Sequence, residues 1–344
     1  MLALPHIGRL PSGPFNAISD VAGVTVGHAT LAQGAIQTGV TVIKPHGGDV
    51  FRDKLPAAAT VFNGFGKSIG LLQVQELGVL ETPIALTNTL SVGTVATAQI
   101  RCAIGSNPEI GRSDPTINPL VFECNDGYLN DIQAMVVTQE HYQQALAAAA
   151  AEFAQGAVGA GRGMSSFDLK GGIGSASRYA KIGGSQYCVG ALVLSNFGKL
   201  PALTLAGRHL GAQLLALRTA SGETPEMGSI IMIIATDAPL DARQLGRLAT
   251  RCGIGLGRTG SIYGHGSGDL ALAFSTAQTV PCRPHDAIRQ SACLHDSLLD
   301  PLFEAVADST EQAIVNALFA AQTVNGRDGH QRLSLSDLAA RLPT

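Results

Sequence analysis

The sequence has no tryptophan and is poor in aromatic and charged side chains. Of its 344 residues, 5% are aromatic and 14% are charged, and the formal net charge is −3. A chain without a basic excess cannot neutralise a phosphate backbone, and so few aromatic rings make a stacking platform for single-stranded nucleic acid unlikely to form. We therefore expect no nucleic-acid partner.

Long apolar runs are missing as well. No uninterrupted apolar stretch reaches the roughly 18 residues that a membrane-spanning helix needs, and the first residues lack the charged and apolar regions of a signal peptide. The six cysteines form no CxxC pair, and most of them lie in apolar segments, as free thiols do in a reducing compartment. We expect a cytoplasmic protein without a membrane partner.

Several signatures of metal, nucleotide and hydrolase sites are absent. The chain has no HExxH, no close set of His and Cys ligands, no GxxxxGK[ST] and no GxSxG. A GxGxxG match at residues 255–260 follows a predicted helix and precedes a predicted strand, which is the reverse of the dinucleotide-binding order, so we interpret it as a structural turn. We expect no metal and no cofactor.

The sequence is rich in apolar residues (45%) and in glycine (41 residues). Its apolar segments are of two kinds, helical and extended. Helical spacing or capping predicts helices at 66–77, 140–153, 241–252 and 296–321. The first 25 to 30 residues and residues 206–221 are expected to be irregular. Short apolar segments predict strands or extended chain at 39–44, 57–63, 83–87, 120–124, 131–138, 187–195, 230–237 and 270–277. This order predicts a layered α/β protein with its sheets inside.

One serine is placed unusually for an ordinary strand residue. Ser229 follows Gly228 and opens a strongly apolar strand, which is where N-terminal nucleophile hydrolases carry their nucleophile. Cleavage before such a residue frees an α-amino group with a pKa near 7.7 to 8, which can act as a base beside the hydroxyl. Taken alone, the Gly-Ser pair also fits a plain serine at the start of a strand.

Two further groups strengthen the hydrolase hypothesis. Ser267 and Asp269 stand two residues apart at a glycine-rich turn into a strand, so a hydroxyl and a carboxylate can face one site and share a proton network. Asn196 directly follows the strand at 187–195 and offers an amide donor for an oxyanion.

Longer sequence segments make this combination of residues specific to one family. The chain resembles the family of L-aminopeptidase/D-esterases and β-peptidyl aminopeptidases over nearly its whole length, with the matching segments in the same order. These segments are DVAGVTVGH (20–28), NGFGKSIGLLQVQELGVLETPIALTNTLSVG (63–93), ECNDGYLND (123–131), GAGRGMSSFDLKGGIGSASR (159–178), LSNFG (194–198), MGS (227–229) and GSGD (266–269).

The resemblance implies a four-layer α/β/β/α sandwich, similar to N-terminal nucleophile hydrolases but with different strand connectivity, in one catalytic domain over residues 1–344. It implies self-cleavage into 1–228 and 229–344, assembly of the paired chains into tetramers, and no metal. The implied activity is removal of N-terminal residues from small peptides, amides or esters that carry a free amino group.

The resemblance also implies roles for residues around the predicted cut. Ser229 matches the nucleophile and Gly228 its cleaved partner, while Ser267 matches a second serine of the site. Asn196 matches the oxyanion asparagine. Asp269 falls where close relatives can have Glu, so its carboxylate is one methylene shorter. Proton transfer is open between the Ser229 amine, Ser267 and Asp269.

Four more residues are assigned through the same resemblance. Tyr128 matches a tyrosine that polarises the bound carbonyl, and Glu123 is the candidate anchor for the substrate's ammonium group. Asn88 is a candidate pocket residue. Arg162 replaces a small polar residue of the family and, if it faces the pocket, narrows the substrate range or favours an acidic group.

Three alternatives stay open on the sequence. One is an amidase of another substrate class in the same superfamily, such as the nylon-oligomer hydrolases, although these cut before Thr. Another is an ornithine acetyltransferase-like enzyme, which shares the architecture but also uses Thr. The third is an unprocessed, inactive homologue that acts as a binding protein.

Overall fold

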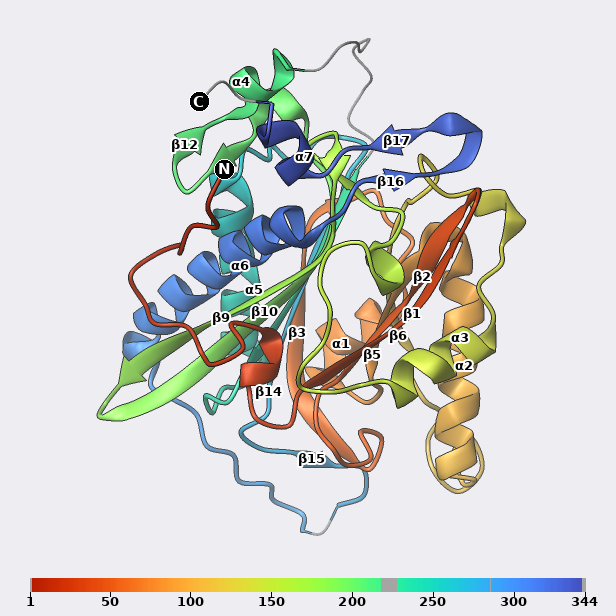
Figure 1. Cartoon of the computed structure of the whole chain (residues 1–344). Helices are drawn as coiled ribbons and strands as arrows, with labels where there is room; N and C mark the ends of the chain where they lie inside the picture. The colour runs from red at the N-terminus through yellow and green to blue at the C-terminus, as the bar shows by residue number, and fades with distance from the viewer. Residues whose placement is uncertain (1, 218–227, 285, 342–344) are drawn as a thin grey trace.

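The computed structural model describes residues 2–217, 228–284 and 286–341. Two β-sheets pack face to face, and a layer of helices covers the outer face of each sheet (Figure 1). Helices α5 (Ala242–Arg258) and α6 (Asp300–Ala320) cover the larger sheet, and helices α2 (Val92–Ser106) and α3 (Gln139–Ala147) cover the smaller one. The predicted four-layer α/β/β/α sandwich is confirmed.

The larger sheet combines strands from distant parts of the chain. Strand β4 (Val79–Leu80) pairs with β3 at one side, and β13 and β14 form the one parallel pair among the described strands of this sheet. The order across the sheet is β15 (Val280–Pro281), β3 (Asp53–Gly64), β14 (Gly268–Ser275), β13 (Ser229–Thr236), β10 (Ser185–Asn196) and β9 (Gly172–Ile182).

The smaller sheet has the order β1 (Thr25–Gln33), β2 (Ile36–Lys44), β5 (Ile84–Asn88) and β6 (Leu120–Cys124). Strands β5 and β6 run parallel and end side by side, so Asn88 lies opposite Cys124. Short pairs lie outside the two sheets: β7 (Ser165–Ser166) with β8 (Leu169–Lys170), β11 (Thr204–Leu205) with β12 (Arg208–His209), and β16 (Val324–Asn325) with β17 (Gln331–Arg332). The short helices are α1 (Leu71–Leu77), α4 (Gly211–Leu215) and α7 (Leu335–Ala339).

Strand β13 shows why a strand between two covered faces is apolar over almost its whole length. Ile230 and Met232 pack into the cluster beneath helices α5 and α6, whereas Ile231 and Ile233 face the other sheet. A strand that is buried on both faces cannot alternate between apolar and polar residues, so its whole length reads as hydrophobic.

Some local predictions were wrong. The predicted helix at 66–77 begins only at Leu71, because Gly70 has φ +92° and its position against Pro119 O leaves no room for a side chain. The first residues are irregular up to residue 24, as predicted, apart from a 3-10 turn (Ile18–Asp20), and β1 begins at Thr25. The segment at 131–138 contains a 3-10 turn (Ile132–Ala134) where an extended segment was predicted. Helix α5 runs on to Arg258, so the GxGxxG match is largely helical rather than a turn.

The expected linker at 206–221 is only partly described. Residues up to 217 form β12 and α4, with Leu210 and Leu214 buried against the core, so this part is structured. Residues 218–221 lie outside the described residues, as does most of the polar segment before Gly228. None of the described helices is long and apolar enough to span a bilayer.

Candidate active site

Four strand ends meet around Ser229. Ser229 is the first residue of β13 and pairs with Asn196, the last residue of β10, on one side and with Gly268, the first residue of β14, on the other. Strand β3 ends beside Gly268, at Gly64. The sheet register therefore gathers the predicted nucleophile, the predicted oxyanion amide and the Ser267–Asp269 turn at one edge.

The Ser229 hydroxyl lies against the peptide bond that is predicted to be cut. Its Oγ donates to Gly228 O at 2.7 Å and accepts from the backbone N–H of Gly268 at 3.1 Å. The side chain is buried, at 6% exposure. Both contacts hold the hydroxyl next to the Gly228 carbonyl, which is the arrangement that intramolecular attack requires.

Ser267 and Asp269 form a buried pair directly beside the nucleophile. Ser267 Oγ donates to Asp269 Oδ1 at 2.7 Å, and both residues are almost completely buried. The turn before them is held by the amide of Asn63, which donates to the backbone carbonyl of Gly264 at 3.0 Å and also to that of Ser267. Because the hydroxyl donates to the carboxylate, its own oxygen keeps its capacity to accept a hydrogen bond.

The Asn196 side chain has one defined orientation. Its Oδ1 accepts from the backbone N–H of Ser165 at 2.8 Å, and its Nδ2 donates to Asn125 O at 3.0 Å. A flipped amide would place two acceptors, or two donors, against each other, so these contacts assign the oxygen and the nitrogen. The second N–H of Nδ2 is available for an oxyanion.

Gly66 lies between the carboxylate of Glu123 and Gly268, the residue that pairs with Ser229. A Cβ on Gly66 would stand 3.5 Å from Glu123 Oε1 and 3.8 Å from Gly268 Cα, so the carboxylate and the strand end are separated by little more than one methyl group. Glu123 accepts from the backbone N–H of Lys67 at 2.7 Å and from the hydroxyl of Thr89. These donors fix the position of the carboxylate, as an ammonium anchor requires.

The buried thiol of Cys124 lies close to several acidic groups. Burial raises the pKa of this thiol well above its usual value, and three neighbouring carboxylates raise it further: Glu123, Asp269 and Asp126. Glu123 from the small sheet and Asp269 from the large sheet therefore both lie near Cys124, although they are far apart in the sequence.

The side chain of Asn88 forms two hydrogen bonds within the fold. Its Oδ1 accepts from Ser91 N at 3.1 Å and caps the turn that leads into α2, while its Nδ2 donates to Thr38 Oγ1 at 2.8 Å. Asp126 is close by and completely buried, and burial raises its pKa to about 6. Sequence reasoning missed Asp126, although it stands within the quoted ECNDGYLND segment.

Tyr128 is carried by the loop that follows β6 and is 39% exposed. Its ring stacks on His330 at 4.6 Å between centroids, and the guanidinium of Arg332 lies 3.7 Å from the ring centroid. Among the described residues, no hydrogen bond joins the Tyr128 hydroxyl to Ser229. Asn125, three residues earlier in the same loop, provides the link to Asn196, and the role of Tyr128 stays a prediction.

Arg162 does not join the strand-end cluster directly. Its Nε donates to Gln37 Oε1 at 2.6 Å, and burial lowers the pKa of the guanidinium. The backbone N–H of Gln37 in turn donates to the side-chain oxygen of Asn130, in the loop after β6. Arg162 therefore braces this loop, and a role in substrate choice stays a prediction.

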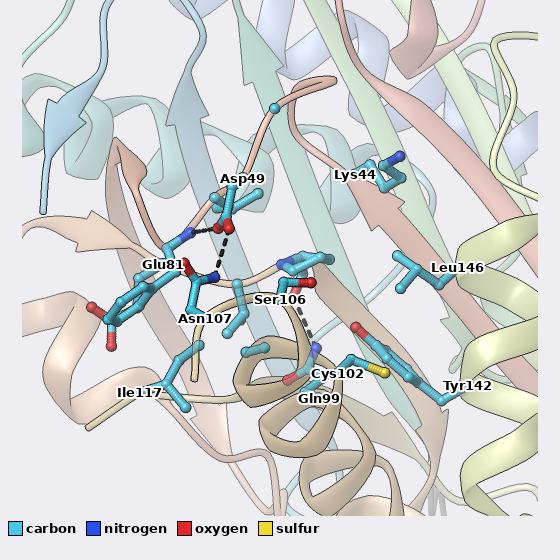
Figure 2. Close-up of a pocket in the computed structure, with 16 residues that line it drawn as sticks. Lys44, Asp49, Glu81, Gln99, Cys102, Ser106, Asn107, Ile117, Tyr142 and Leu146 are labelled. Atoms are coloured by element: carbon cyan, nitrogen blue, oxygen red, sulfur yellow. Dashed lines mark hydrogen bonds between the residues drawn. The ribbon is translucent and has the colours of Figure 1, made fainter. Parts of the chain in front are cut away.

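A cavity of about 350 Å³ lies away from these residues, between α2, α3 and the end of β2 (Figure 2). Its carboxylates are engaged by the protein: Asp49 accepts from Asn107 Nδ2 at 2.6 Å, and Glu81 accepts from Asn118 N at 2.7 Å. None of the residues predicted for catalysis is among its described lining residues. Within the described ranges, no group of three or more His, Cys, Asp or Glu side chains could hold a metal ion.

The fold and these contacts match what is expected of a hydrolase with a serine nucleophile at the start of a buried strand. The model of peptidase family S58 matches residues 16–332, and the chain belongs to this family. It is a serine-type aminopeptidase hydrolase.

The similar proteins cover nearly the whole chain. "Beta-peptidyl aminopeptidase BapA" of Sphingosinicella microcystinivorans is 38% identical, over 99% of this chain and 90% of its own length. The PH0078 protein from Pyrococcus horikoshii OT3 is 48% identical, with a TM-score of 0.91 over 96% of this chain and 93% of that one. The L-aminopeptidase D-Ala-esterase/amidase from Ochrobactrum anthropi, described as a variant among the Ntn hydrolase fold, is 33% identical, with a TM-score of 0.87 over 98% and 97%.

Proposed function

We propose that the protein cuts itself between Gly228 and Ser229 and then acts as an aminopeptidase through a Ser229 acyl-enzyme. The contact of Ser229 Oγ with Gly228 O, in a site completed by Gly268 N–H and Asn196, carries this proposal. In the first reaction Oγ attacks the Gly228 carbonyl carbon, the hydroxyl proton passes to the Ser229 nitrogen, and the peptide bond is replaced by an ester. Breaking the C–N bond frees the α-amino group of Ser229, and water then hydrolyses the ester to give the Gly228 carboxylate and the free Ser229 hydroxyl.

The same hydroxyl attacks the substrate carbonyl in the processed enzyme. The α-amino group of Ser229 takes the hydroxyl proton, and the Ser267–Asp269 pair, joined at 2.7 Å, accepts a hydrogen bond from this amine and keeps it oriented. Asn196 Nδ2 and the Tyr128 hydroxyl bind the oxyanion, an interaction worth about 3 kcal/mol for each donor. The leaving amine takes a proton from the Ser229 ammonium, and water releases the acyl group by the reverse sequence.

Glu123 gives the enzyme its preference for chain ends. Its fixed carboxylate, close to Gly268, pairs with the ammonium group of a substrate's first residue and places the next carbonyl at Ser229. The substrates are small peptides, amides or esters with a free amino group. The names of the relatives, which cover β-peptides and L- or D-configured residues, support testing all three kinds of acyl group.

The mass of denatured protein tests the cut. In proportion to the 35.4 kDa of the whole chain, processing gives species of about 23.5 and 12 kDa, and Ser229→Ala should give one species near 35 kDa. Two species in both proteins would assign the cut to another agent. One species in both would favour the alternative of an unprocessed binding protein.

Turnover tests the second reaction. Processed protein should release nitroaniline from an L-, D- or β-aminoacyl p-nitroanilide, and N-acetylation of that substrate should abolish release because Glu123 then meets no ammonium. Processing without release from any of these substrates would contradict the aminopeptidase and favour an amidase of another class.

We further propose that two or more processed pairs assemble, with a tetramer as the expected state, and that the enzyme works in the cytoplasm. The six cysteines, all present as free thiols, support a reducing compartment. Light scattering of processed protein measures the assembly, and fractionation of the source cells measures the location.

A further inference from the structure

The β16–β17 hairpin lies against the loop that carries Tyr128. Arg327 N donates to Leu129 O at 2.8 Å, Arg327 Nε donates to Gly127 O at 2.7 Å, and His330 Nδ1 lies 2.8 Å from Tyr128 O. The backbone of Tyr128 and of both its neighbours is therefore bonded to a hairpin about 200 residues later in the chain.

The ring of Tyr128 is held by the same hairpin. The guanidinium carbon of Arg332 lies 3.7 Å from the ring centroid, and the His330 ring stacks on it with 10° between the planes. The Arg332 side chain is only 14% exposed. A cation held over an aromatic face is worth more when it is shielded from water, so this contact fixes the ring firmly.

Arg332 also reaches the loop that orients Asn196. Its Nε donates to Ser165 Oγ at 3.1 Å, and its Nη2 lies 3.9 Å from Asp168 Oδ1. The backbone N–H of Ser165 is the donor that fixes Asn196 Oδ1. One guanidinium thus contacts the ring of Tyr128 and the residue that sets the orientation of the Asn196 amide.

We propose that Arg332 is a positioning residue that holds Tyr128 and Asn196 in register with each other as the two donors to the oxyanion. The inference rests on the proposed function, because it needs an oxyanion at this place. Arg332 acts through these two side chains and does not touch the substrate. Since the oxyanion exists only in the transition state, loss of Arg332 should lower kcat and leave KM nearly unchanged.

The kinetic test uses processed protein and a p-nitroanilide that the wild type hydrolyses. We expect Arg332→Met to lower kcat about tenfold with KM within about twofold, and Arg332→Lys to recover part of the loss because it keeps the charge without the planar fork. Arg341→Met removes an exposed arginine near the C-terminus and should match the wild type.

A double-mutant cycle separates positioning from a general effect on folding. In the Tyr128→Phe background the donor hydroxyl is gone, so Arg332→Met should lower kcat by a smaller factor than in the wild type, because only the part that acts through Asn196 remains. Equal factors in both backgrounds, or a kcat of Arg332→Met equal to that of the wild type, would overturn the proposal.

A second measurement is independent of activity. The chain has five tyrosines and no tryptophan, so its near-ultraviolet circular dichroism is dominated by tyrosine. The difference between wild type and Tyr128→Phe defines the Tyr128 signal, and Arg332→Met should reduce that signal whereas Arg341→Met should not. If the wild type hydrolyses nothing, the proposed function fails by itself, and an unchanged Tyr128 signal overturns the positioning as well.

Discussion

At the scale of single residues, the Asn196 amide is oriented by two backbone groups on opposite sides. Ser165 N–H binds its oxygen and Asn125 O binds its nitrogen, so the remaining N–H has a fixed direction. A donor that is already oriented needs no reorganisation when the oxyanion forms.

This orientation predicts a large effect on the rate and a small one on binding. Asn196→Ala should lower kcat by about 10²- to 10³-fold while KM changes little, because the lost bond exists only in the transition state. Initial rates over a range of substrate concentrations measure both. A rise in KM with kcat unchanged would place Asn196 in ground-state binding instead.

Asp126 predicts a dependence of stability on pH. Its Oδ2 has no hydrogen-bond partner among the described residues, and burial raises the pKa of the carboxyl from 3.8 to about 6. The folded protein therefore binds this proton more tightly than the unfolded chain does. The stability that the neutral acid allows is present below about pH 4 and is lost as the pH rises through 6.

Asp126→Asn should remove this dependence, since the amide keeps the contact with Asn130 and carries no charge. At pH 8 the variant should be more stable than the wild type by about 3 kcal/mol, and near pH 4 the two should be equal. Urea unfolding at both pH values measures the gap. A gap that does not change with pH would contradict the assignment.

The sequence predicted residue types at this site better than their contacts. Ser229, Ser267 and Asp269 stand beside glycines and Asn196 ends a strand, and the structure gathers the four at one sheet edge. The structural tasks of Asn63, Thr89 and Arg332 were not predicted. Each of them acts on a residue that is distant in the chain, and one sequence carries no signal for such pairs.

At the scale of elements, the packing of α5 on α6 explains why a helix was predicted to stop too early. Residues 252–258 contain three glycines, a composition that favours a turn. In the structure Gly255 faces α6, where a Cβ would stand 2.5 Å from Ala307 O, so close helix packing requires glycine there. Tertiary contact outweighs the low helix propensity.

Two glycines of this helix make a matched pair of variants. Gly255→Ala should destabilise the protein by about 1 to 3 kcal/mol, because the new methyl group meets backbone atoms of α6. Gly257 is exposed and has open space at its Cβ, so Gly257→Ala should stabilise by up to about 1 kcal/mol. Thermal unfolding compares them, and equal shifts would refute the packing argument.

Strand β9 and helix α2 were missed for a similar reason. Strand β9 is rich in Gly, Ser and Ala, and a Cβ on its Gly174 would stand 1.9 Å from Ala313 O of α6. Helix α2 contains Val, Thr and Gly, which disfavour an isolated helix, and it forms because Val92, Val95 and Ala96 bury against the small sheet.

At the scale of the whole molecule, the proposed cut divides a sheet whose strands are interleaved. Strand β3, from the first fragment, lies between β15 and β14 of the second, and β13 of the second pairs along its whole length with β10 of the first. Neither fragment holds the whole of the larger sheet.

The two fragments should therefore behave as one folding unit. Gel filtration in native buffer should give both in one peak, and denaturant should unfold them in a single transition. Residues 229–344 produced alone should not fold, which circular dichroism can check. A folded, soluble 229–344 would show that the shared sheet is not needed.

Because the strands are interleaved, some neighbours of Ser229 are synthesised after Ser229 itself. Ser229 leaves the ribosome before β14, which supplies Gly268, and well before the hairpin that holds Tyr128. The incomplete chain has the serine but neither of these neighbours. If Ser229 acts as proposed, completion of translation is a condition for hydrolysis, and a nascent chain that is still being made is protected from its own nucleophile.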